Sequence, residues 1–218
     1  MDEPSGSSNG AAVPGTNGTP DPYMSATVAA FLDDLAARTP APGGGAAASV
    51  TCAMAAGLVE MAASFTSATG LERVRVRAHE LREEVSSLAY ADGRAYAVVL
   101  EALRMEPGEE RTTRLDAAVA GAIACPMNML RIAAEVATLA ADMAETGNRN
   151  LEGDALAGAL LAEASARSAA TLAQLNVSLL SRHASTGAHL ERLRPQLAAA
   201  TRARERAVEA YARLERVS

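Results

Sequence analysis

The stretch that decides the fold is LERVRVRAHELREEVSSLAYADGRAYAVVLEALRM, residues 71–105. Its apolar and small residues recur in steps of three and four, which is the period of a helix that packs along a heptad seam. The seam positions are Leu71, Val74, Ala78, Leu81, Val85, Leu88, Asp92, Ala95, Val99 and Ala102. A helix of about 35 residues is about 50 Å long. The sequence therefore predicts a long rod that packs against other rods.

Working outward, most of the chain has the same character. The segment from about 110 to 146 repeats the three-and-four steps, and glycine or proline lies at most of the expected breaks. The other helices are expected over about 25–38, with Ser25 as the cap, and over 45–68, 152–182 and 187–217. The seam of the 110–146 helix is Leu115, Val119, Ala122, Pro126, Met129, Ala133, Val136, Ala140 and Met143. Long helices joined by short loops favour an all-α, antiparallel up-and-down bundle of about five to six long helices.

Composition supports helices that approach one another closely. The chain of 218 residues contains 52 alanines, 20 arginines and no lysine, and only 3% of its residues are aromatic. Alanine is the best helix former, and its small side chain lets helix axes come close. The first 23 residues are rich in Gly, Pro, Ser and Asn and are expected to be a disordered tail. Residues 24–218 are expected to form the single helical domain.

The net charge and the cysteines limit which binding partners and which cellular compartment are expected. A net charge of −6 argues against a nucleic-acid-binding domain. The longest uncharged apolar run, residues 43–59, is too short to span a bilayer comfortably, and no signal peptide is evident. Cys52 and Cys125 lie far apart in apolar surroundings, which favours buried thiols over a disulfide. We therefore expect a soluble, cytoplasmic protein that contacts neither nucleic acid nor membrane.

Asp92 is the exception in the seam of the 71–105 helix. Its neighbours at three and four residues are Leu88, Ala89, Ala95 and Tyr96. A carboxylate on an apolar stripe is costly unless it is paired or faces a polar cavity. Asp92 therefore either lies near the surface, paired with an arginine, or lies buried in a cleft. In a cleft its pKa would be raised, which suits a general acid or base.

Three further polar features have both a structural and a ligand-binding interpretation. The segment PAPGGG (40–45) precedes a helix, where N–H groups can hold an anion or simply form a flexible turn. TGNRNLEGD (146–154) places Asn148, Asn150 and Asp154 at a helix start, as caps or as ligand-binding groups. Asn176 lies in an apolar helical stretch and needs a partner, either in the protein or in a ligand. The histidines and cysteines lack metal-ligand spacing, so no metal site is expected.

Together these segments resemble the formiminotransferase-cyclodeaminase family, in its cyclodeaminase part and stand-alone bacterial relatives. The opening segment, residues 31–66, is the most specific part of the resemblance. The remaining matches follow in the same order: ADGRAYAVVLEALRMEP (91–107), ACP (124–126), GNRNLEGD (147–154) and LNV (175–177).

This resemblance implies a homodimeric helical bundle with a tetrahydrofolate derivative as substrate and no cofactor. Members cyclise 5-formiminotetrahydrofolate to 5,10-methenyltetrahydrofolate and release ammonia. The alternatives are a methenyltetrahydrofolate cyclohydrolase and a catalytically inactive, dimeric binding protein. The resemblance makes Asp92 the first catalytic candidate and Asp154 the second. It assigns substrate binding to Pro42, Gly43, Gly44, Gly45, Tyr96, Asn148, Asn150 and Asn176. Departures from the family pattern at Gly153, Leu172 and Leu180 are expected to affect the substrate pocket.

Overall fold

The computed structural model describes residues 21–66 and 71–180, together with the single positions 195, 198, 202 and 205. This part of the chain contains helices and no strands, which confirms the all-α fold class. The four long helices are α3 (Gly44–Ser64), α4 (Leu71–Arg104), α5 (Glu109–Thr146) and α6 (Glu152–Leu180). Two short helices come first, α1 (Pro22–Ser25) and α2 (Val28–Ala36), and the 3₁₀ turn η1 (Arg149–Leu151) leads into α6. The helix predicted over 187–217 lies outside the described residues, apart from those single positions.

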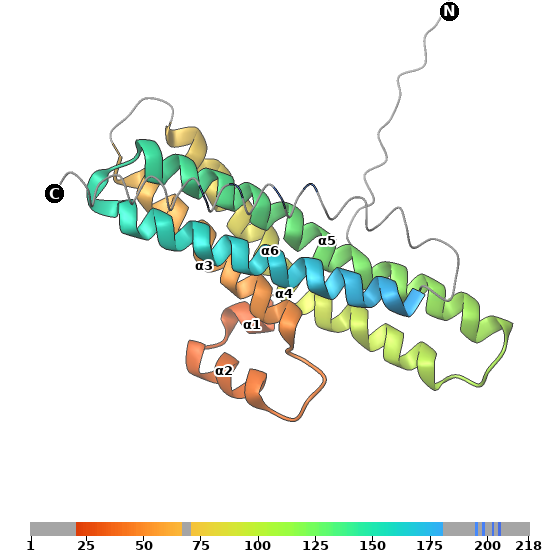
Figure 1. Cartoon of the computed structure of the whole chain (residues 1–218). Helices are drawn as coiled ribbons and strands as arrows, with labels where there is room; N and C mark the ends of the chain where they lie inside the picture. The colour runs from red at the N-terminus through yellow and green to blue at the C-terminus, as the bar shows by residue number, and fades with distance from the viewer. Residues whose placement is uncertain are drawn as a thin grey trace, which may run out of the picture.

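The four long helices form an up-and-down bundle, as the sequence predicts (Figure 1). Helix α3 packs on α4 and α6, and α5 packs on the same two helices, so that α4 and α6 occupy opposite corners. Along each interface, residue numbers rise in one helix as they fall in the other, so neighbouring helices are antiparallel. The contacting pairs are Gly45–Asp92 and Gly57–Arg82 between α3 and α4, Arg77–Glu135 and Arg131–Glu84 between α4 and α5, and Ala122–Asn176 and Ala140–Gly158 between α5 and α6.

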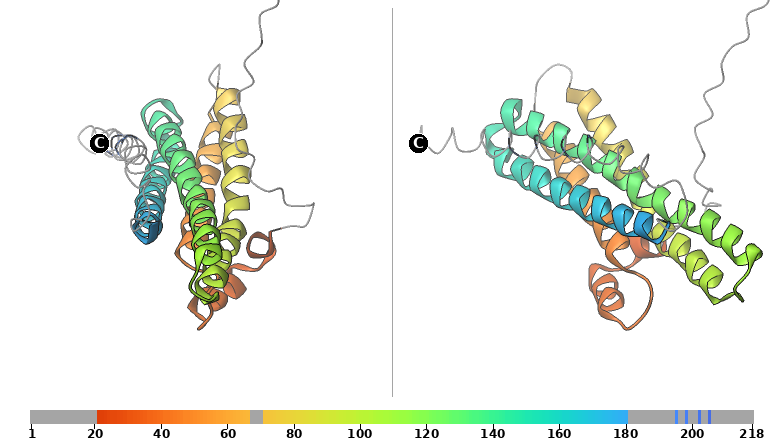
Figure 2. Two further views of the ribbon diagram at one scale, coloured as in Figure 1. Left: turned by 90° about the vertical axis from the view of Figure 1, so that its right-hand side faces the viewer. Right: turned by 45° about the vertical axis from the view of Figure 1, so that its right-hand side comes forward.

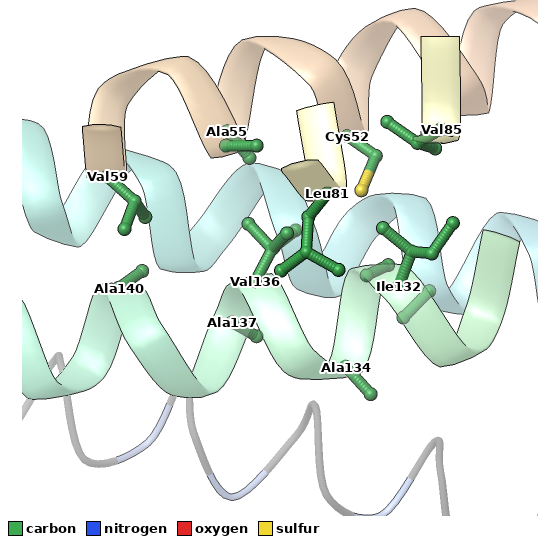
Figure 3. Packing of buried hydrophobic residues seen from close by; sticks show 14 of the residues in the cluster. Cys52, Ala55, Val59, Leu81, Val85, Ile132, Ala134, Val136, Ala137 and Ala140 are labelled. Carbon is green, nitrogen blue, oxygen red and sulfur yellow. The ribbon is translucent and has the colours of Figure 1, made fainter. Parts of the chain in front are cut away.

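Small side chains let these helices approach closely. A Cβ on Gly158 of α6 would lie 3.4 Å from the backbone oxygen of Ala55 in α3. Figure 3 shows Val59 of α3 and Ala140 of α5 facing each other in the core, with Leu81 nearby. Cys52 is fully buried there, and both Cys52 and Cys125 are free thiols, as predicted. The high alanine content therefore serves the close packing of α3, α5 and α6.

Both predicted seams lie in the core. Every predicted seam residue of α5 is buried except Leu115, which is partly buried. In α4 the buried seam residues are Ala78, Leu81, Val85, Leu88, Val99 and Ala102, while Leu71, Val74 and Ala95 pack against the core from its edge. Asp92 is half-buried within this row. The heptad pattern thus identified the core face of α4 and left Asp92 as its single charged member.

The N-terminal region differs from the prediction. Ser25 ends α1 and caps nothing further, whereas Thr27 caps α2 by accepting a hydrogen bond from the Ala30 N–H. Asp21, expected in the disordered tail, caps α1 and also accepts a hydrogen bond from the Tyr90 N–H of α4. Figure 2 shows that α1 and α2 lie outside the four-helix bundle, beside the start of α3. Ser and Thr are both good caps, so the sequence alone did not choose between positions 25 and 27.

By length and composition alone, α3 and α5 are apolar enough to cross a membrane. In the bundle, 56% of the most apolar stretch of α3 and 61% of that of α5 are buried inside the protein. The core helix of a soluble protein meets the same criterion, so this likeness to membrane spans is weak.

Candidate active site

The centre of the candidate site is the contact between Asp92 of α4 and the first turn of α3. A Cβ on Gly45 would lie 1.9 Å from Asp92 Oδ2 and 2.3 Å from Cγ. Only a residue without a side chain lets the carboxyl group approach the α3 backbone this closely. The glycine segment (PAPGGG, residues 40–45) and the seam residue Asp92, which were identified separately in the sequence, therefore meet in the folded chain.

Within the part of the chain that the structure describes, the Asp92 carboxyl group has no countercharge. Among residues 21–66 and 71–180 it forms no ion pair, so the surface arginine pairing considered from the sequence does not occur there. Burial raises its pKa above the ordinary value of 3.8. A carboxyl group in this state accepts and releases a proton closer to neutral pH than an exposed aspartate does.

Cys125 of α5 lies near the same carboxyl group. Burial, and secondarily the charge of Asp92, raise the pKa of the Cys125 thiol to about 11. The thiol is therefore neutral at physiological pH and gives Asp92 a soft, uncharged neighbour. Sequence reasoning treated Cys125 only as a buried thiol, because the register that places it beside Asp92 depends on how α4 and α5 pack.

The start of α3 is open to a ligand's polar atoms. Gly43 is the N-cap residue and no side chain caps this end, while the Ala47 N–H already bonds to the Gly43 carbonyl. The N–H groups of the first helical residues have no partner within the helix. Pro42 is buried just before this turn, and the Cβ of Ala41 lies 3.2 Å from where a Cβ of Gly93 would be. The loop is thus packed against α4 next to Asp92.

Two other predicted residues lie near this level of the bundle. Tyr96 follows Asp92 by one turn on α4 and is 42% exposed. The side-chain amide of Asn176 in α6 donates a 2.8 Å hydrogen bond to the Ala122 carbonyl of α5, one turn before Cys125. The partner that a half-buried asparagine requires is therefore in the protein, and its side-chain oxygen remains available as an acceptor.

Asn148, Asn150 and Asp154 lie at the opposite end of the bundle. Asn148 accepts a hydrogen bond from the Asn150 N–H, and its amide donates to the Phe65 carbonyl at the C-terminal end of α3. The glycine segment begins that same helix, which has 21 residues and is therefore about 30 Å long. One copy of the chain consequently does not bring these residues together with Asp92.

A shallow groove of about 500 Å³ runs between α3 and α6 and begins beside Gly44. The Leu172 side chain lies 3.7 Å from where a Cβ of Gly44 would be and forms part of the groove wall. Small and hydroxyl-bearing residues line most of the rest, with Arg167 as the charged member: Ala47, Ala48, Thr51, Ala164, Ser165, Ser168 and Thr171. Leu172, a departure from the family pattern, therefore borders the glycine segment.

No cluster of three or more His, Cys, Asp or Glu side chains in the described ranges is arranged to hold a metal ion.

Comparisons with known proteins agree on one family. The family model described as formiminotransferase-cyclodeaminase matches residues 27–194. A methenyltetrahydrofolate cyclohydrolase from Methylorubrum extorquens is 32% identical over 84% of this chain and 94% of its own length. The crystal structure of formiminotetrahydrofolate cyclodeaminase from Thermotoga maritima superposes with a TM-score of 0.79 at 30% identity, covering 86% of this chain and 96% of that one. Rat formimidoyltransferase-cyclodeaminase is 26% identical over 61% of this chain and 27% of the rat protein.

Proposed function

The chain belongs to the formiminotransferase-cyclodeaminase family, and from this premise we propose that it is a formiminotetrahydrofolate cyclodeaminase. It would convert 5-formiminotetrahydrofolate to 5,10-methenyltetrahydrofolate and ammonia. The observation that carries the proposal is the half-buried Asp92 carboxyl group, which has no ion-pair partner among the described residues and lies against the first turn of α3. The segments that resemble the family in order along the chain support the same proposal.

The reaction requires a group that moves one proton between two nitrogens. The formimino group reacts in its protonated form, in which the terminal nitrogen carries two hydrogens. N10 of the folate attacks the formimino carbon and loses its proton, and the N10–C bond forms as the electron pair of the C=N bond moves to the terminal nitrogen. The resulting NH2 group takes up one proton and leaves as ammonia when its C–N bond breaks, and the positive charge stays on the methenyl product. Asp92, as carboxylate, would accept the N10 proton and, as carboxylic acid, deliver it to the leaving amine. A raised pKa makes both forms accessible near neutral pH.

Methenyltetrahydrofolate cyclohydrolase activity is the second candidate. It is favoured by the Methylorubrum extorquens relative of that name, which matches along 94% of its length and is therefore a stand-alone protein of similar extent. Here water attacks the carbon between N5 and N10, and the ring opens when a C–N bond breaks and the nitrogen is protonated. The proton-transfer role of Asp92 is the same in both reactions.

We place part of the folate along the groove between α3 and α6. The groove begins at Gly44, whose helix start offers free N–H groups to a carbonyl or carboxylate of the substrate. Arg167 can contribute to binding the glutamate tail, because guanidinium groups bind carboxylates well. Proton transfer within the substrate requires no cofactor.

We also propose that the protein acts as a cytoplasmic homodimer.

A spectroscopic assay tests the proposal. Purified protein is mixed with 5-formiminotetrahydrofolate, and the absorbance of the methenyl product is followed. Enzyme-dependent appearance of the chromophore supports cyclodeaminase activity. In a parallel sample of 5,10-methenyltetrahydrofolate, accelerated loss of absorbance supports the cyclohydrolase. A folded protein that is inactive in both samples would contradict the enzymatic proposal.

A further inference from the structure

Ser49, on the second turn of α3, is an unusual buried hydroxyl group. The residue is completely buried, and its Oγ has no hydrogen-bond partner among the described residues. Other hydroxyl side chains on the long helices bond to the carbonyl four residues earlier, as Thr51 does to Ala47 and Thr138 to Ala134. A buried polar group without a partner is costly, so its presence calls for a physical reason.

The position of Ser49 relates it to Asp92. Residues four apart share one face of a helix, so Ser49 follows Gly45 on the face that meets the Asp92 carboxyl group. Helical side chains also lean toward the N-terminus and cover the preceding turn. The Ser49 hydroxyl therefore lies over the turn that contains Gly45, toward the carboxyl group that rests on it.

Among the described residues, no side chain donates a hydrogen bond to the Asp92 carboxyl group. From α5 it faces the neutral thiol of Cys125, which is a weak donor. On its own helix, the Arg94 guanidinium lies over the Tyr90 ring, 6.0 Å from the centroid. From α1 the Tyr23 hydroxyl lies 3.8 Å from where a Cβ of Gly93 would be. From α6, Asn176 uses one of its two amide N–H groups for the Ala122 carbonyl.

We propose that Ser49 is a positioning residue for Asp92: its side chain rotates to donate a hydrogen bond to the carboxylate when Asp92 is charged. The bond would orient the carboxylate and limit how far burial raises its pKa. A catalytic role for this hydrogen bond rests on the proposed function, whereas the existence of the hydrogen bond does not.

The direct test is a ¹³C NMR titration of the Asp92 carboxyl carbon in the folded protein, assigned by its loss in Asp92→Asn. A hydrogen bond to the charged form lowers a carboxyl pKa, so Ser49→Ala should raise the pKa of Asp92 by roughly one pH unit, about tenfold in acid dissociation constant. Ser86→Ala on α4, whose hydroxyl bonds to the Arg82 carbonyl, is the matched control and should leave the titration unchanged. An unchanged titration in Ser49→Ala would overturn the proposal.

Two further measurements separate this inference from its alternatives. If Ser49 only fills space, Ser49→Ala retains the wild-type Asp92 titration and gains thermal stability, because an unpaired buried hydroxyl is removed. If the proposed function also holds, the kcat-against-pH profile of Ser49→Ala moves in the same direction as the NMR pKa. A wild-type protein without turnover would refute the proposed function alone, since the NMR titration requires no substrate.

Discussion

The Asp92 carboxyl group lies directly against the Cα of Gly45, so that a Cβ on residue 45 would come within 1.9 Å of Asp92 Oδ2. This contact joins two helices at the point where α3 begins. It removes the carboxyl group from much of the solvent without giving it a countercharge, and burial accordingly raises its pKa. The absence of a side chain at position 45 is therefore a requirement of the candidate site.

The first prediction concerns that missing side chain. Gly45→Ala should displace Asp92 and lower kcat/KM by about 100-fold, because a shift of about 1 Å in a catalytic group has costs of that order. Overpacking should also lower the free energy of unfolding by about 1–3 kcal/mol, partly offset by the better helix propensity of alanine. Gly121→Ala is the control, since a Cβ there meets nothing within 4 Å, and it should keep full activity. Wild-type activity in Gly45→Ala would show that the contact is dispensable.

The second prediction is that Asp92→Asn abolishes turnover while the fold is kept. Asparagine has nearly the same shape but cannot exchange a proton, so kcat should fall by about 10²- to 10⁴-fold, as for loss of a general acid or base. Circular dichroism should be unchanged, because no hydrogen bond or ion pair to Asp92 from the described residues is lost. Retained activity would assign the proton transfer to another group.

The third prediction concerns the pH dependence of stability. The pKa of Asp92 is raised in the folded protein, so the folded state binds its proton more tightly than the unfolded state does. Its contribution to stability is therefore complete below the ordinary pKa of 3.8 and is lost as the pH rises through the folded pKa. Asp92→Asn removes this pH-dependent loss of stability. Thermal unfolding at a series of pH values should show the variant gaining stability relative to wild type as the pH rises, and a constant difference would contradict the raised pKa.

The sequence predicted the fold well, because its signals are local. Pro107 and Gly108 end the predicted 71–105 helix, and α4 ends at Arg104. Gly147 closes the predicted 110–146 helix, and α5 ends at Thr146. The errors in the described helices lie at their ends: the cap at position 25 was wrong where two suitable caps stand close together, and the helix predicted over 45–68 ends at Ser64. Turn and cap chemistry acts over a few residues and can be read without knowing the packing.

The site was predictable only in part. Asp92 stood out because a carboxylate interrupts an apolar seam, which is again a local signal. Its contact with Gly45 and its proximity to Cys125 depend on the register between helices. Alanine-rich faces specify that register weakly, since many offsets pack similar side chains. Apart from the family resemblance, the sequence therefore indicated Asp92 as a candidate for proton transfer but did not indicate its surroundings.

The fourth prediction concerns the groove wall. Leu172 lies beside Gly44, and the resemblance in the sequence marks it as a departure from the family pattern. If the folate occupies the groove, Leu172→Ala should enlarge the space next to the glycine segment and lower KM by roughly tenfold, the scale of a few methylene groups in a pocket. Steady-state kinetics with both folate substrates measure the change. An unchanged KM would place the folate away from this wall.

The last prediction addresses the two ends of the bundle. Asn148, Asn150 and Asp154 lie about 30 Å from the Gly45–Asp92 contact along α3, so one copy cannot present both groups to one folate. If both groups act on the same substrate, a second copy must supply one of them. Asp92→Asn and Asp154→Asn should then each be inactive alone.

Mixing the two variants under conditions that exchange subunits should restore about one quarter of wild-type activity. Half of the dimers formed are mixed, and each mixed dimer has one site with both aspartates intact. Size-exclusion chromatography with light scattering checks that dimers form. If Asp154→Asn is fully active alone, its role is confined to the start of α6, where an acidic residue stabilises the helix dipole. If both variants are inactive and the mixture stays inactive despite exchange, the two aspartates do not share a site between subunits.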